Sequence, residues 1–84
     1  MSSELALLRL RVATESDPNA LSQVIQRFQN LNIVPRRLSA EFGSNDVLHI
    51  QVDVCGVPEG QLALITRKIQ EVPTTLRAHW HRVI

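Results

Sequence analysis

SDPNALSQVIQRFQNL, residues 16–31, is the stretch that decides the fold. Asp17 can cap a helix, because its carboxylate accepts hydrogen bonds from the free amides of a first turn. Pro18 suits the first helical position, where its missing amide is not needed. The apolar residues that follow are spaced three or four apart, which predicts one buried helical stripe: Leu21, Val24, Phe28 and Leu31.

Strand patterns lie on both sides of this helix. Before it, residues 5–12 alternate apolar side chains with arginines, which predicts one buried and one solvated face. Asn30 and Asn32 suit the helix end, since asparagine tolerates a left-handed cap. Alternation returns over residues 33–42, where Pro35 cannot donate to a ladder and so favours an edge strand. The stretch therefore predicts a strand, a short loop and a helix N-terminus that could hold an anion.

The second half of the chain repeats this order. Residues 43–46, GSND, form a turn signal between two strand patterns and predict a hairpin. The strand at 47–54 is followed by a helix that Pro58 opens and Pro73 ends. The last strand, residues 75–84, is expected to point Leu76, Ala78 and Trp80 inward.

The order strand, helix, strand, strand, helix, strand predicts a single domain over residues 1–84. We expect an α+β ferredoxin-like βαββαβ two-layer sandwich, in which a four-stranded antiparallel sheet carries both helices on one face. The first and third strands should be central. The other face should be polar and partly basic, with these residues: Arg9, Arg11, Arg37, His49, Gln51, Asp53, Arg77, His79 and His81.

Composition excludes several classes of protein. The 84 residues carry a formal net charge of +1, so no general attraction for nucleic acid is expected. One cysteine cannot form an internal disulfide, which favours a reducing, cytoplasmic setting. No apolar run approaches the ~20 residues of a membrane span, and the N-terminus does not resemble a signal peptide.

The sequence predicts no catalytic site, no cofactor and no metal. It has no glycine-rich phosphate loop, and no base is placed beside a nucleophile. His79, His81 and His49 share an expected sheet face, but no carboxylate or cysteine is spaced to complete a ligand set, so exposed histidines are the preferred interpretation. Phe28, Phe42 and Trp80, the only aromatic residues, all fall on expected buried faces, which argues against RNA stacking on the open sheet face.

The segments LRLRVATESDPNAL, LNIVPRRLSAEF and VLHIQVDV resemble the ACT domain, over roughly residues 5–83. A single domain of this length is most similar to the regulatory small subunits of acetolactate synthase. The resemblance implies a homodimer or higher oligomer, a large catalytic partner subunit and a small amino acid bound between subunits. It places the ligand at Asp17, Asn19, Ala20 and Leu21 of one chain and at Ile33 and Val34 of its neighbour.

Asn19 departs from the family pattern, because many ligand-binding members have glycine directly after the helix-opening proline. Glycine lets backbone amides approach a ligand carboxylate closely, whereas the Asn19 side chain either crowds the ligand or hydrogen-bonds to it. Asp17 with Pro18 is also an ordinary helix cap. Three hypotheses follow: a non-catalytic amino-acid-sensing module, a structural dimerisation module that has lost its effector, and a nucleic-acid-binding module that uses the basic sheet face.

Overall fold

The computed structural model describes residues 6–84, and their secondary structure follows the predicted order. The elements are β1 (Leu7–Glu15), α1 (Ala20–Gln29), β2 (Arg37–Phe42), β3 (Val47–Cys55), α2 (Glu59–Gln70) and β4 (Thr75–Arg82). A 3-10 turn, η2 (Ser44–Asp46), lies inside the β2–β3 hairpin. Leu5, predicted to begin the first strand, lies outside the described residues.

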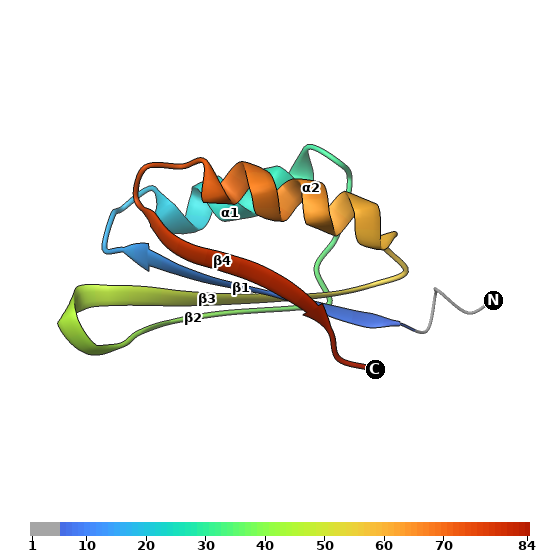
Figure 1. Ribbon diagram of the computed structural model, residues 1–84, viewed down its shortest axis with the longest axis horizontal. Helices are drawn as coiled ribbons and strands as arrows, with labels where there is room; N and C mark the ends of the chain where they lie inside the picture. The colour runs from blue at the N-terminus through green and yellow to red at the C-terminus, as the bar shows by residue number, and fades with distance from the viewer. Residues whose placement is uncertain (1–5) are drawn as a thin grey trace.

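The four strands form one antiparallel sheet in the order β2-β3-β1-β4, and both helices cover one face of it (Figure 1). β1 and β3 are central and β2 is an edge strand, as predicted. The α+β ferredoxin-like sandwich is therefore confirmed. No helix in the part of the chain that the structure describes has the length and apolar character needed to cross a bilayer.

The core lies between the sheet and the helices. Alternate residues of the two central strands point into it and meet apolar residues of both helices. Its buried members are Leu8, Leu10, Val12, Val24, Phe28, Ile50, Val52, Val54, Leu62, Ile65, Ile69 and Ala78. No residue of β2 belongs to this set, which leaves the edge strand with little cover.

The start of α1 differs slightly from the prediction. The helix begins at Ala20, so Pro18 lies in the preceding turn rather than at the first helical position. The predicted Asp17 cap is also displaced: Asn19 holds the N-cap position without a side-chain capping hydrogen bond, and the Asp17 carboxylate accepts from the Asn19 amide at 2.7 Å, in the turn before the helix. At the other end Asn32 has φ 57°, and the Ile33 amide donates to the Phe28 carbonyl oxygen, so the predicted left-handed ending is confirmed.

Three residues predicted to be buried are exposed. Leu31 is one of them, at 39% exposure, because α1 ends at Gln29 and Leu31 lies in the turn that follows. Phe42 lies on the helix side of β2 but is 69% exposed, because this edge strand extends beyond the packed core. Leu76 is also exposed, since the β1–β4 register shifts between Ala13 and Thr14 and leaves it without a partner on β1. Trp80 is half-buried and packs against the core.

Candidate functional site

The turn between β1 and α1 forms the corner at which the sequence predicts ligand contacts. Asn19 is exposed, Ala20 is buried, and Leu21 is half-buried against the core. The Ser22 hydroxyl donates to the Asn19 carbonyl oxygen at 3.0 Å, which ties the turn to the helix. The Asn19 side chain makes no capping hydrogen bond to the helix. The corner therefore presents the polar side chains of Asp17 and Asn19 beside a packed helix start.

Two amides at this corner already have acceptors within the chain. The Asn19 amide donates to the Asp17 carboxylate, and the Ala20 amide donates to the Asp17 carbonyl oxygen at 3.0 Å. A ligand carboxylate at the same place would meet the negative charge of Asp17. The second oxygen of that carboxylate retains acceptor capacity, so Asp17 suits an ammonium group better than another anion.

Ile33 and Val34 lie past the opposite end of α1. Ile33 packs against the core, whereas Val34 is 87% exposed. The helix between the two sets has 10 residues and therefore rises about 15 Å. One chain does not bring Asn19 and Val34 together, and a site containing both needs two copies, as the resemblance implied.

The cavity beneath the corner is too small for an amino acid. Its volume is about 10 Å³, between the start of α1 and the facing ends of β1 and β4. One water molecule would fill such a space. The Thr14 hydroxyl spans the gap by donating to the Thr74 carbonyl oxygen at 3.0 Å. Any amino acid held here must therefore lie outside this protomer's own core.

The helix-free face of the sheet is polar, and its rows follow from the strand register. One row holds Arg37, Asp53, Arg9 and His81 across the four strands. The next holds Ser39, Gln51, Arg11 and His79, and the third holds Glu41, His49, Ala13 and Arg77. Ser39 and Glu41 lie on the same face as Arg37, as alternation along β2 predicts.

Arg9 and Asp53 form an ion pair on this face. The Arg9 guanidinium donates twice to the carboxylate, which is 4% exposed. These hydrogen bonds hold the pKa of Asp53 below its usual range despite burial, and the charges of Arg37 and Arg11 act in the same direction. This row is therefore internally neutralised, apart from Arg37.

The three histidines of this face are exposed and come from β3 and β4. The rings of His79 and His81 are stacked with centroids 6.3 Å apart. Within residues 6–84, no three His, Cys, Asp or Glu side chains are grouped closely enough to hold an ion. The arrangement supports the interpretation of exposed histidines beside arginines.

Searches with the sequence alone found neither a matching family model nor a matching curated protein. Solved structures do match. The C-terminal domain of the MgtC protein from Mycobacterium tuberculosis has a TM-score of 0.78 at 15% identity, over 99% of this chain and 93% of that one. The ACT domain of the GTP pyrophosphokinase of Chlorobium tepidum has a TM-score of 0.74 at 11% identity, over 89% and 96%. The GlnK–ATP complex of B. subtilis gives 0.55 at 9%, over 99% and 84%. The chain therefore shares the ACT-like fold with these proteins.

Proposed function

We propose that this chain is a non-catalytic regulatory module that binds a small amino acid between two copies and thereby modulates a metabolic enzyme. The observation that carries the proposal is the uncovered edge strand β2. Leu38 and Phe42 are 40% and 69% exposed on it, and apolar side chains beside an unpaired strand edge favour pairing with another chain.

Antiparallel pairing of β2 with its own copy would also complete the predicted ligand site. The Phe42 end of β2 lies at the same end of the sheet as the start of α1, and the Arg37 end lies with the end of α1 (Figure 1). A two-fold axis between the two β2 strands reverses the strand direction in the second copy. It would therefore bring the second copy's Val34 toward the end at which Asn19 lies.

The ligand contacts follow from the chemistry of the corner. Asp17 would accept from the ammonium group of the amino acid, and the ligand carboxylate would lie beside Asn19, whose side chain limits how closely it approaches the helix start. Leu21 of one copy, with Ile33 and Val34 of the other, would contact the ligand side chain, while Ala20 leaves room beside the helix. Because both copies touch the ligand, binding would favour one subunit arrangement and change the activity of an attached enzyme.

The ACT-like fold of the neighbours supports a regulatory role, and the resemblance of the sequence to the regulatory small subunits of acetolactate synthase suggests the kind of enzyme. The large catalytic subunit of such an enzyme would be the partner. Thermal unfolding with each of the twenty amino acids tests effector binding directly, because a ligand that binds only the folded protein raises Tm progressively as its concentration increases. One or two amino acids are expected to do so.

Matched variants separate assembly from ligand binding. Leu38→Lys should convert the dimer to a monomer in light scattering, whereas Leu64→Lys, at an equally exposed position on α2, should leave it intact.

Asp17→Asn should weaken amino-acid binding, whereas Glu71→Gln removes the same charge elsewhere and should not. Asn19→Gly is expected to preserve or tighten binding, because glycine removes the crowding side chain; abolished binding would make that side chain a required contact.

Two observations favour a second function: the Asn19 amide already donates to the Asp17 carboxylate, and the cavity below it is too small for an amino acid. Both suit a structural dimerisation module that keeps the fold and no longer binds an effector. An intact dimer with no Tm shift from any amino acid would select this alternative over the sensor.

A further inference from the structure

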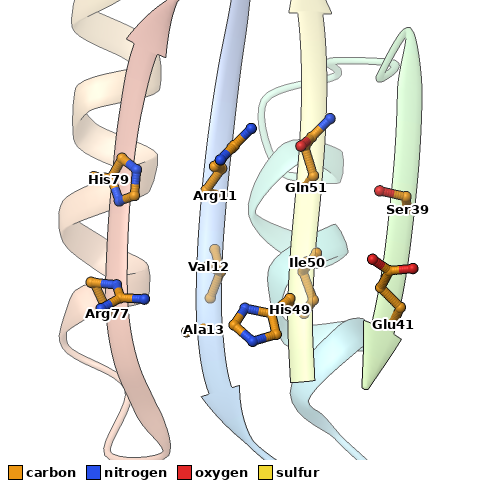
Figure 2. Close-up of a pocket in the computed structure, with 10 residues that line it drawn as sticks. All are labelled: Arg11, Val12, Ala13, Ser39, Glu41, His49, Ile50, Gln51, Arg77 and His79. Carbon is orange, nitrogen blue, oxygen red and sulfur yellow. The ribbon is translucent and has the colours of Figure 1, made fainter. Parts of the chain in front are cut away.

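A shallow hollow of about 450 Å³ lies on the helix-free sheet face, away from the α1 corner (Figure 2). Its lining comes from all four strands and includes Arg11, Ala13, Glu41, His49 and Arg77. This volume is within the range of small-molecule sites. The hollow does not depend on β2 pairing or on an amino-acid effector.

The floor of the hollow exists because Ala13 interrupts the row of long polar side chains. His49 on β3 and Arg77 on β4 are its register neighbours. Figure 2 shows both side chains reaching toward Ala13 from opposite sides. A larger residue at position 13 would fill the space over which these two groups converge.

Two guanidinium groups in the hollow have no ion-pair partner among residues 6–84. Arg9 is paired with Asp53, but no salt bridge of this part of the chain involves Arg11 or Arg77. Arg11 faces His79 across β1 and β4, so Arg77 is its diagonal neighbour, with Cα atoms about 7–8 Å apart. At that spacing both guanidiniums can contact one oxyanion, which would relieve their mutual repulsion.

Further donors are held beside this pair. The His49 ring lies against the backbone of Gly43, where an added Cβ would be 2.8 Å from two ring atoms. His79 stands next to Arg11 across the strands, and each imidazole supplies at least one N–H donor. The β2 side of the hollow offers instead a hydroxyl and a carboxylate, from Ser39 and Glu41.

We infer that this hollow is a binding site for a small phosphate monoester with a hydroxyl-bearing body, such as a sugar phosphate. The phosphate dianion would bind to Arg11 and Arg77, whose planar forks suit its oxygens. The hydroxyl groups would lie toward Gln51, Ser39 and Glu41, where both acceptors and donors are available. The volume exceeds what phosphate alone needs and leaves room for such a body.

The test is an NMR titration of the ¹⁵N-labelled full chain with inorganic phosphate and with glucose 6-phosphate, each at constant ionic strength set with NaCl. We expect saturable shifts in the amides of residues 11–13, 49–51 and 77–79, with tighter binding of glucose 6-phosphate. Arg11→Gln and Arg77→Gln should each weaken binding of both probes about tenfold. Arg67→Gln on α2 removes the same charge away from the hollow and should change affinity less than about twofold.

Glu41→Gln tests the contacts to the ligand's hydroxyl groups separately from the contacts to its phosphate. It should weaken glucose 6-phosphate several-fold and leave inorganic phosphate unchanged or slightly tighter, because only the hydroxyl groups use this carboxylate. The wild-type pattern of amide peaks confirms that each variant is folded. Since the hollow is independent of the amino-acid site, the titration can succeed or fail without deciding the outcome of the Tm screen.

Three results would overturn the inference. The first is an absence of saturable shifts up to about 10 mM of either probe. The second is equal weakening by Arg67→Gln, which would reduce the effect to general charge. The third is a preference for citrate, or for single-stranded RNA with affinity rising with length, over both phosphate probes.

Discussion

The Arg9 guanidinium binds the Asp53 carboxylate through two hydrogen bonds, from Nε to Oδ1 at 2.8 Å and from Nη2 to Oδ2 at 3.0 Å. The two residues face each other across the central strands β1 and β3. Because the carboxylate is nearly buried, this pairing compensates for its lost hydration.

The pair predicts acid sensitivity of the fold. The lowered pKa of Asp53 means that its charged form is favoured in the folded state, so its contribution is present above the unfolded pKa of about 3.9 and is lost as pH falls through the lower folded pKa. The free energy of unfolding in urea should therefore fall less steeply below about pH 4 in Asp53→Asn than in the wild type. Parallel curves for the two proteins would contradict this.

Carboxyl NMR titration can assign the cause of the shift. Arg9→Gln should return the pKa of Asp53 toward or above its usual value, because the hydrogen bonds from Arg9 are the largest influence and burial is then opposed only by the charges of Arg37 and Arg11. Arg37→Gln removes only a neighbouring charge and should raise the pKa less. An equal rise in both variants would show that charge, rather than hydrogen bonding, dominates.

The two phenylalanines should differ sharply in their contribution to stability. Phe28 is 1% exposed in the core, and its replacement by alanine should lower the free energy of unfolding by about 3–5 kcal/mol. Phe42→Ala, at the exposed end of β2, should change it by less than about 0.5 kcal/mol. Urea titrations at low protein concentration, where the monomer dominates, provide the comparison.

Glycine to alanine substitutions should have opposite effects at two positions. Gly60 lies in the first turn of α2 with open space around it, so Gly60→Ala should stabilise the protein by about 0.5–1 kcal/mol. Gly43→Ala would push the His49 ring aside and should cost up to about 1 kcal/mol while shifting the His49 resonances. Adding His49→Ala to Gly43→Ala should remove most of that cost; an additive double mutant would refute the contact.

The left-handed residue at the end of α1 gives another test. With φ 57°, Asn32 adopts a conformation that costs other side chains about 1–2 kcal/mol, so Asn32→Ala should destabilise by about 1 kcal/mol and Asn32→Gly should be neutral or stabilising. Asn30 has φ −62°, and Asn30→Ala serves as the control with an effect below about 0.5 kcal/mol. A loss of stability on Asn32→Gly would indicate that the asparagine side chain itself stabilises the turn.

The sequence predicted the fold well because alternation and turn residues are local signals. Strict alternation in β1 and β3 identified their inward sides, and the prolines with Asn32 located the helix ends to within three residues. The exposure of Phe42 could not be predicted in this way. Alternation tells which side of a strand a residue occupies, whereas the extent of cover depends on where the helices lie across the sheet.

The chemistry of the sheet face was predictable only in part. The basic character of the face followed from alternation, but the pairing of Arg9 with Asp53 and the convergence on Ala13 depend on the register between strands far apart in sequence. At the α1 corner, Asp17 was predicted to cap the helix. The hydrogen bond from the Asn19 amide to the Asp17 carboxylate could be identified only from the structure. Whether the corner binds an amino acid stays a prediction.

Insertions in the hairpin at residues 43–46 should be tolerated only if they do not shift the pairing of β2 with β3 by an odd number of residues. Ser39 and Glu41 alternate with Leu38, Ala40 and Phe42 along β2, so the two sets point to opposite sides of the sheet. A slip of one residue against β3 would exchange them, carrying apolar groups into the hollow and a carboxylate onto the helix side. Substitutions can alter one face of β2 without affecting the other. An insertion or deletion leaves both faces intact only if it does not shift the register of β2 against β3 by an odd number of residues.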